Sequence, residues 1–187
     1  MKSALLYLPL LSVLAIYVAR LLELGTKRDL IAGKIRENLT LRLFLLAGTV
    51  IFVASVAEYF WRGARINWPL FSLGWICGIA SFWIRRKAIA ALGRFWSLHV
   101  EIRENHEFVR SGPFRFVRHP AYLSMILELL ALALICGALF TLLLIPLLFV
   151  PVLIMRVRLE EAALVEKFGT AYREYQLSTP ALFPYKW

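Results

Sequence analysis

Long apolar runs alternate with polar segments along this chain. The runs cover residues 4–17, 43–56, 69–84 and 122–155. A helix needs about 20 apolar residues to cross a hydrocarbon core about 30 Å thick. With their ends included, the first three runs predict spans over residues 3–24, 41–61 and 68–86. The pattern therefore predicts an all-α integral membrane protein.

The last apolar run is too long for one span. As a single helix, residues 122–155 would extend about 50 Å at 1.5 Å per residue, well beyond the thickness of the bilayer core. Gly137 lies near the middle of the run, and glycine is the usual residue at a sharp reversal of the chain. We therefore predict a tight hairpin of two antiparallel helices over residues 121–136 and 139–158, which makes five transmembrane helices in all.

The distribution of basic residues tests the number of spans. With five spans, three of the 22 lysines and arginines, Lys2, Arg62 and Arg65, lie on one side of the membrane and the other nineteen on the opposite side. Cytoplasmic loops carry an excess of Lys and Arg, so we expect the N-terminus outside and the C-terminus in the cytoplasm. The net charge of +10 then reflects topology and contacts with membrane lipids, and we expect no nucleic-acid partner.

A single membrane domain over residues 1–187 is the simplest organisation, because the chain has no long linker, low-complexity tract or repeat. Its two cysteines, Cys77 and Cys136, both lie in apolar runs. They are expected to pack there as small side chains and to form neither a disulfide nor a metal site. We expect no metal cofactor.

Two polar segments, residues 85–120 and 156–187, flank the hairpin on the expected cytoplasmic side. Because the hairpin enters and leaves the membrane on one face, residues about 40 positions apart are expected to meet there. They are Arg118, His119 and Tyr122 at the entry and Arg156, Glu160 and Glu161 at the exit. Such a polar cluster is costly at that depth unless its members pair or bind a ligand. Composition alone leaves open a simpler interpretation, a basic headgroup belt with a weak ion pair between Arg156 and Glu160.

Together the two segments resemble the isoprenylcysteine carboxyl methyltransferase family and its prokaryotic relatives, which include phospholipid methyltransferases. The resemblance covers about residues 85–185. It rests on the stretch 106–122, on Arg156 followed by Glu160-Glu161, and on residues 168–175. The order, the spacing and the position of these pieces around the hairpin carry the resemblance. It implies that a cytoplasmic loop and a C-terminal helix form a pocket for S-adenosylmethionine.

By this resemblance, a set of polar and aromatic residues is expected to bind the cofactor. They are His99, His106, Glu107, Phe108, Val109, Phe114, His119, Pro120, Ala121, Tyr122 and Glu160. Arg156 would face the acceptor and orient a carboxylate or phosphate through its two-pronged guanidinium group. Most of the rate enhancement is expected from positioning and electrostatics. An amine or thiol acceptor would also need a base, for which Glu161 and His119 are candidates.

Glu128 lies about two turns into the fourth predicted span, where an ionisable side chain is expensive and often functional. Two interpretations are open for it: a protonated carboxyl group that hydrogen-bonds a neighbouring helix, or a residue that binds the acceptor. Glu58 and Arg62 are four residues apart and are expected to form an ion pair at the membrane boundary.

The sequence therefore predicts an S-adenosylmethionine-dependent methyltransferase, similar to protein-S-isoprenylcysteine O-methyltransferases, with S-adenosylhomocysteine as the second product. The acceptor would be lipophilic: the carboxylate of an isoprenylcysteine-like group, a lipid or a small molecule. It would arrive through the membrane, while the polar cofactor arrives from the cytosol. The alternatives are an NADPH-dependent membrane reductase of the sterol-reductase type, although the chain lacks a glycine-rich dinucleotide motif, and a non-enzymatic scaffold.

Overall fold

The computed structural model describes residues 5–25, 34–35, 39–93, 96, 101–102 and 108–183. Most of these residues are helical. The α-helices are α2 (Leu8–Gly25), α3 (Leu39–Trp61), α4 (Trp68–Leu92), α5 (Pro120–Ile135), α6 (Val150–Phe168) and α7 (Thr170–Ser178). Shorter helical turns are η2 (Gly112–Arg115), η3 (Thr141–Leu143) and η4 (Ile145–Phe149). Two short strands, β1 (Lys34–Ile35) and β2 (Glu101–Ile102), pair antiparallel and are a small exception to the predicted all-α fold.

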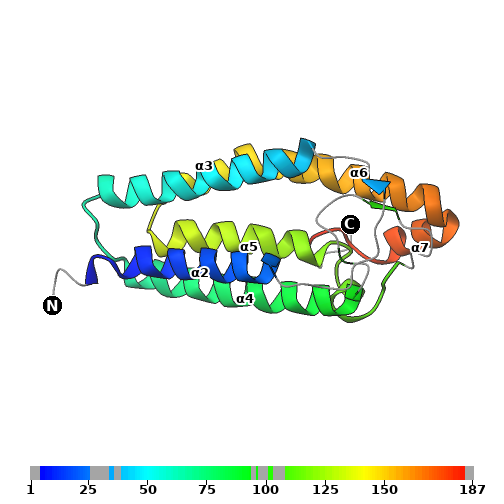
Figure 1. Ribbon diagram of the computed structural model, residues 1–187, viewed down its shortest axis with the longest axis horizontal. Helices are drawn as coiled ribbons and strands as arrows, with labels where there is room; N and C mark the ends of the chain where they lie inside the picture. The colour runs from blue at the N-terminus through cyan, green and yellow to red at the C-terminus, as the bar shows by residue number, and fades with distance from the viewer. Residues whose placement is uncertain are drawn as a thin grey trace.

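The long helices run roughly along the longest axis of the molecule (Figure 1). In this view α2, α4 and α5 form one group, and α3 runs with α6. The start of α2 and the turns from α3 to α4 and from α5 to η3 lie at one end. The short helix α7 lies at the other end, where α5 begins and α6 finishes. The two ends of the α5–α6 hairpin therefore meet at the end that holds α7.

The predicted hairpin is present. Helix α5 ends at Ile135, and Gly137 has a φ of +62°, a conformation that favours glycine. The returning segment is irregular at first, with the 3₁₀ turn η3 and the π turn η4, because Pro146 has no N–H for a regular helical bond. It then continues as α6 to Phe168, ten residues beyond the predicted end of the span at 158, and Gly169, with a φ of +57°, terminates it.

Two helical stretches are long and apolar enough to cross a membrane, Leu39–Trp61 and Thr141–Phe168, and two shorter apolar ones cover Leu8–Arg20 and Pro120–Ile135. Large apolar side chains on these helices are exposed, for example Leu147 at 68%. A broad apolar surface is costly in water and expected in lipid. The prediction of five spans stays a prediction, since α4 is helical throughout but does not reach the same hydropathy.

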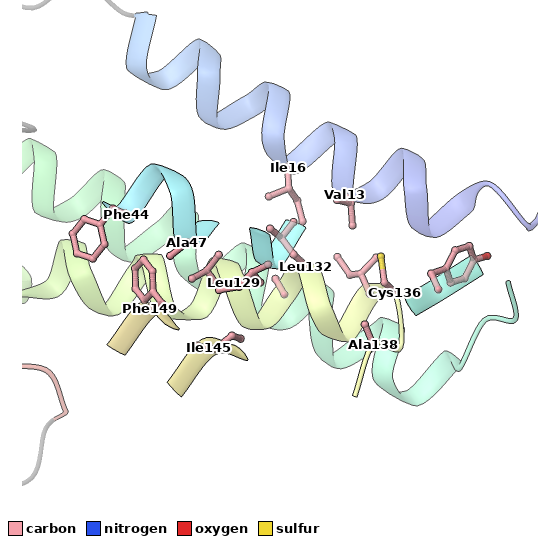
Figure 2. Packing of buried hydrophobic residues seen from close by; sticks show 14 of the residues in the cluster. Val13, Ile16, Phe44, Ala47, Leu129, Leu132, Cys136, Ala138, Ile145 and Phe149 are labelled. Carbon is pink, nitrogen blue, oxygen red and sulfur yellow. The ribbon is translucent and has the colours of Figure 1, made fainter. Parts of the chain in front are cut away.

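The apolar core lies between the helices and draws on most of them (Figure 2). It includes Val13 and Ile16 of α2, Phe44 and Ala47 of α3, and Leu129 and Leu132 of α5, with Ile145 and Phe149 on the returning segment. Cys136 is buried in this core and Cys77 is partly buried, and both are free thiols as predicted.

Helix α4 approaches α5 closely through small residues. A Cβ atom at Gly74 would lie 2.7 Å from Cγ1 and 2.8 Å from the backbone nitrogen of Ile135. Gly78 faces Ala131 in the same contact, at 3.7 Å from a Cβ built on the glycine. Small residues at helix interfaces let backbones approach closely and are typical of helices packed in membranes.

Glu58 holds the turn of the hairpin at the end opposite to the site. Its carboxylate accepts hydrogen bonds from the backbone N–H of Phe140 (3.0 Å) and from the N–H and hydroxyl of Thr141 (both 2.8 Å). The predicted partner Arg62 lies 3.6 Å away and also donates to the carbonyl of Gly137 at 3.3 Å. The ion pair predicted from the sequence is therefore present, and Glu58 additionally caps the start of η3.

Candidate functional site

Tyr122 of α5 connects two charged residues of α6. Its hydroxyl donates to Oε2 of Glu160 at 2.6 Å and accepts from Nε of Arg156 at 2.9 Å. Arg156 and Glu160 are four residues apart and share a helix face. The prediction that the entry and the exit of the hairpin share one face is therefore confirmed.

Local sequence explains where α5 places Tyr122. Pro120 occupies the first turn of the helix, where its fixed φ and its missing N–H cost nothing. His119 precedes it as the capping residue, and its ring stacks on the Tyr122 ring with a centroid distance of 5.5 Å. Pro120 is fully buried. The start of α5 is thus rigid, and it presents His119 and Tyr122 side by side to α6.

Helix α3 also contributes to the surroundings of Arg156. The Nη1 group of Arg156 donates to Oγ1 of Thr40 at 2.9 Å, and its guanidinium carbon lies 5.6 Å from the centroid of the Phe44 ring. Arg156 is only 3% exposed. Nothing in the sequence pointed to Thr40, which lies 116 positions from its partner. Because these groups hold the guanidinium in place, Arg156 is a fixed positive charge inside the helix bundle.

Glu161 forms a second cluster beside the first, just beyond the predicted span. Its Oε1 atom accepts from Nε of Arg118 at 2.8 Å and lies 3.0 Å from Nε2 of His119. The amide of Gln176 donates to Oε2 at 2.9 Å. Burial disfavours the charged form of Glu161, but the hydrogen bonds and charges of His119 and Arg118 outweigh it and lower its pKa to about 2. A carboxylate with this pKa is a weak base, so its contacts favour a positioning role for Glu161.

The segment after α7 is joined to the residues before α5. The side chain of Arg118 donates to the backbone carbonyls of Gln176, at 3.0 Å, and Thr179. The backbone N–H groups of Arg118 and His119 donate to the carbonyls of Pro180 and Ala181 at 2.8 and 2.9 Å. The C-terminal segment is therefore hydrogen-bonded to the residues at the entry of the hairpin.

Aromatic rings join α7 to the loop that precedes η2. Phe108 packs against Phe168, Tyr172 and Tyr175 with centroid distances of 4.9, 5.4 and 5.8 Å. The hydroxyl of Tyr175 donates to the carbonyl of Phe114 at 2.6 Å. Burial raises the pKa of Tyr175 to about 12, so this phenol remains a donor at neutral pH. Phe108 thus packs in one aromatic cluster with α7, and the backbone of Phe114 is hydrogen-bonded to it.

Val109 and Ala121, which are also predicted to bind the cofactor, are partly buried. The Glu160 side chain is 34% exposed, so it is more accessible than the side chain of Glu161. His99, His106 and Glu107 lie outside the described residues. Within the described part of the chain, no group of three or more His, Cys, Asp or Glu side chains is placed to hold a metal ion.

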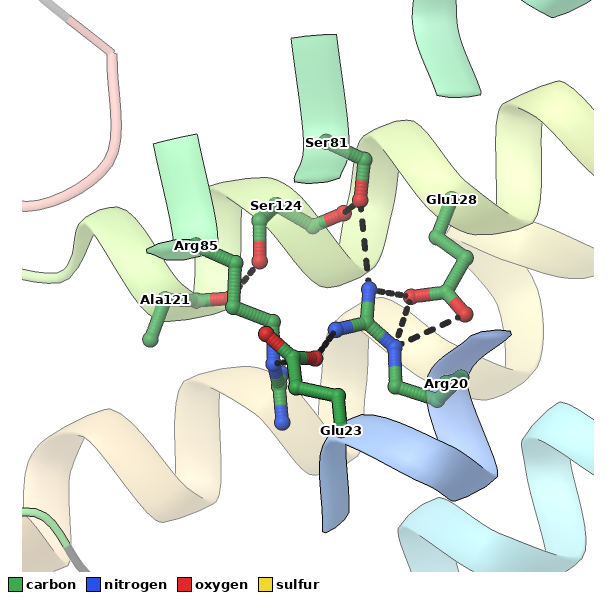
Figure 3. Close-up of polar contacts among 7 residues, drawn as sticks. All are labelled: Arg20, Glu23, Ser81, Arg85, Ala121, Ser124 and Glu128. Atoms are coloured by element: carbon green, nitrogen blue, oxygen red, sulfur yellow. Dashed lines mark hydrogen bonds and ion pairs between the residues drawn. The ribbon is translucent and has the colours of Figure 1, made fainter. Parts of the chain in front are cut away.

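Glu128 lies in a different cluster (Figure 3). It accepts hydrogen bonds from Nε of Arg20 on α2 at 2.8 and 3.0 Å. At 3.6 residues per turn, Glu128 and Tyr122 point about 120° apart around α5. Of the two interpretations left open by the sequence, the bond to a neighbouring helix is present, with a charged arginine as its donor. Arg20 was missed as this partner, because nothing in the sequence pairs α2 with α5.

A helical hairpin in an apolar bundle, with a polar site where its ends meet, is the architecture of a membrane-embedded helical protein. Residues 75–166 match the sequence model of the isoprenylcysteine carboxyl methyltransferase (ICMT) family. The matched segment includes Tyr122, Arg156 and Glu160. Over this segment the chain belongs to the ICMT family.

Three curated proteins show the range of relatives. The uncharacterized protein YpbQ of Bacillus subtilis is 32% identical over 83 residues, 44% of this chain and 49% of that protein. The cobalt-zinc-cadmium resistance protein CzcN of Cupriavidus metallidurans is 30% identical over 125 residues, 66% of this chain and 53% of CzcN. The protein-S-isoprenylcysteine O-methyltransferase of Schizosaccharomyces pombe is 30% identical over 115 residues, 60% and 48% of the two chains. The chain thus spans about half the length of these curated relatives.

Proposed function

We propose that this protein is a membrane methyltransferase that uses S-adenosylmethionine to methylate a lipophilic acceptor. The observation that carries the proposal is the bridge from Arg156 through the Tyr122 hydroxyl to Glu160. It lies within the segment that matches the ICMT family. It also joins the two sequence segments on which the expected cofactor site depends.

The chemistry of the site suits the cofactor. Glu160 is a partly exposed carboxylate that can accept hydrogen bonds from an ammonium or hydroxyl group. The neighbouring His119 and Tyr122 rings offer aromatic faces, and Phe108 and Phe114 offer apolar surface. We propose that these residues hold S-adenosylmethionine together with Val109, Pro120 and Ala121, and with His99, His106 and Glu107 outside the described residues. When bound, the cofactor supplies a methyl group made electrophilic by the sulfonium centre.

Arg156 is proposed to orient the acceptor. Its guanidinium is buried and held by Tyr122 and Thr40, so its charge is fixed in place before the acceptor arrives. A preorganised charge of this kind stabilises an anionic acceptor without further rearrangement. A carboxylate acceptor is already ionised and needs no base, which agrees with the engagement of Glu161 by Arg118 and His119. An isoprenylcysteine-like carboxylate is the acceptor that the name of the fission-yeast relative favours.

We further propose that the N-terminus lies outside and that the site faces the cytoplasm, in a chain that crosses the membrane five times. Exposed basic residues support this orientation. Arg86 and Lys87 of α4, Arg115 of η2 and Arg173 of α7 are all exposed near the end of the molecule that holds α7. Such an excess of positive charge is typical of the cytoplasmic side. The arrangement gives the polar cofactor access from the cytosol and the acceptor access from the bilayer.

Binding of S-adenosylhomocysteine to the purified protein in detergent, followed by calorimetry, tests the proposal. We expect saturable binding that weakens about 3- to 30-fold in Glu160→Gln, because one charged hydrogen-bond acceptor is lost. Glu174→Gln, at an exposed position on α7, is the matched control and should bind like the unchanged protein. Saturable binding of NADPH without binding of S-adenosylhomocysteine would overturn the proposal in favour of a reductase.

Transfer of tritium from S-[methyl-³H]adenosylmethionine to a farnesylcysteine carboxylate or to a membrane lipid extract tests the acceptor. We expect label in the organic phase, and loss of label in Arg156→Gln while S-adenosylhomocysteine still binds. Binding without transfer to either acceptor would contradict the proposed acceptor class and leave the cofactor assignment standing. If neither cofactor binds, a non-enzymatic scaffold is favoured.

A further inference from the structure

Arg85 is a buried arginine near the cytoplasmic end of α4. It is only 4% exposed. Its guanidinium carbon lies 5.2 Å from the centroid of the Trp96 ring, and its Nε atom is 3.1 Å from Oε2 of Glu23 on α2. The side chain is therefore sandwiched between an aromatic ring and a carboxylate, in a position that none of the proposed catalytic roles uses.

The neighbouring Arg20 takes most of the available carboxylate oxygens. It donates to both oxygens of Glu128, to Oε2 of Glu23 and, at 3.4 Å, to the hydroxyl of Ser81. Arg85 shares only Glu23 with it. Figure 3 shows the Arg85 guanidinium on the far side of Glu23 from the Arg20–Glu128 pair. Although its Nε atom lies 3.1 Å from Oε2 of Glu23, this buried donor forms no hydrogen bond with any residue that the structure describes.

The burial of this guanidinium costs free energy unless a further hydrogen-bond acceptor contacts it. A guanidinium carries five N–H donors, and leaving a buried charged donor unsatisfied costs about 1–3 kcal/mol or more. A phosphate or carboxylate satisfies two of these donors at once through a two-pronged contact. The Trp96 ring holds the guanidinium plane for such a contact.

We propose that Arg85 binds the oxyanion head group of a lipid-like amphiphile at the cytoplasmic end of α2 and α4. The depth agrees, because Arg85 directly follows the apolar residues 69–84 and so lies at the level of lipid head groups. Arg86 and Lys87 are exposed beside it and add positive potential that attracts anionic head groups. The site does not depend on methyl transfer.

Native mass spectrometry of the full-length protein, delipidated in detergent, tests this site. Three probes separate the contributions: dioleoyl phosphatidate carries the oxyanion and the chains, dioleoylglycerol carries the chains alone, and inorganic phosphate is the oxyanion alone. We expect phosphatidate to bind at least about tenfold more tightly than dioleoylglycerol, because a charged two-pronged contact is added. Equal affinity for these two lipids overturns the proposal. Tight binding of inorganic phosphate would identify a free oxyanion as the ligand and overturn the amphiphile.

Arg85→Gln and Arg86→Gln form a matched pair, since both remove one charge from adjacent positions of α4. We expect phosphatidate affinity to fall about tenfold or more in Arg85→Gln and by less than about twofold in Arg86→Gln. Equal effects in the two variants would show that only general surface charge attracts the lipid, and would overturn the site. If Arg85→Gln does not fold, Arg85→Lys is used. It keeps the charge and loses the fork, so an affinity unchanged from the original protein would equally overturn the proposal.

Discussion

The hydroxyl of Tyr122 lies 2.6 Å from Oε2 of Glu160, although the two residues are 38 positions apart. The same hydroxyl accepts a hydrogen bond from Arg156. One phenol thus separates a positive charge from a negative charge in the proposed site. In the proposed function Arg156 faces the acceptor and Glu160 faces the cofactor, and the phenol between them takes the place of a direct ion pair.

Tyr122→Phe removes this bridge and keeps the aromatic ring. We expect affinity for S-adenosylhomocysteine to fall about 3- to 10-fold, in line with the loss of about 1 kcal/mol per hydrogen bond. Calorimetry in detergent measures the change. Tyr17→Phe, on the exposed face of α2, is the control and should leave the affinity unchanged. Equal affinities in the two variants would show that the bridge does not order the cofactor site.

Glu161→Gln is expected to destabilise the fold. The amide cannot balance the charge of Arg118 or pair with a charged His119, whose side chains lie within 3.0 Å of the present carboxylate. A loss of about 1–3 kcal/mol corresponds to a thermal midpoint lower by about 2–12 °C for a chain of this size. Thermal unfolding in detergent measures it, with Glu174→Gln as the control.

The same variant carries a pH signature. Because the pKa of Glu161 is lowered from 4.5 to about 2 in the folded protein, its contribution to stability is complete above pH 4.5. That contribution is lost as the pH falls from about 4.5 towards 2. The difference in thermal midpoint between the original protein and Glu161→Gln should therefore be constant from pH 8 to 5 and shrink below. A difference that already shrinks between pH 8 and 6 would assign the effect to a group other than Glu161.

The parts of the fold that follow from the length of an apolar run and from the residue type at a turn were predictable. The apolar run at 122–155 was too long for one helix, and Gly137 marked the reversal. Once the hairpin was inferred, the meeting of Tyr122 with Arg156 and Glu160 followed from topology, since both ends of a hairpin lie on one face.

The pairings between separate helices were not predictable in the same way. Arg20 bonds Glu128 across 108 positions, and Arg156 bonds Thr40 across 116. Periodicity indicates which face of a helix is apolar, but it does not determine which other helix covers that face. Arg20 and Thr40 carry no local signal beyond a polar residue near a helix end. Gln176 was missed for a similar reason, because one amide on a short helix is usually solvated.

Gly74→Ala tests the close contact between α4 and α5. The new Cβ would lie 2.8 Å from the backbone nitrogen of Ile135, which cannot move without shifting α5. We expect a loss of about 1–3 kcal/mol in stability from overpacking, measured as a lower thermal midpoint. Gly48→Ala on α3 is the matched control, because a Cβ atom added there would meet no other atom within 4 Å and alanine favours the helix. If both variants have the same midpoint, α4 and α5 are not as tightly packed as this contact requires.

Arg20 and Glu128 provide a test of the role of Glu128. Removing one member of a buried pair leaves an uncompensated charge and costs about 3–5 kcal/mol, whereas removing both is often close to neutral. We therefore expect Arg20→Gln to lower the thermal midpoint more than the double variant Arg20→Gln with Glu128→Gln. Equal destabilisation by the single and the double variant would show that the two side chains act independently.

The double variant also tests whether Glu128 binds the acceptor. It removes the carboxylate of Glu128 together with the positive charge of Arg20, which would otherwise be left without its partner. Glu128 faces α2 and points about 120° away from Tyr122 around α5, so we expect the KM for the acceptor to stay within about twofold of its original value. The affinity for S-adenosylhomocysteine should be unchanged as well, and it serves as the control for an intact site. An acceptor KM raised about tenfold or more with cofactor affinity preserved would contradict a purely structural role. It would place Glu128 in the acceptor site, since a positional effect on Tyr122 or Glu160 would weaken the cofactor too.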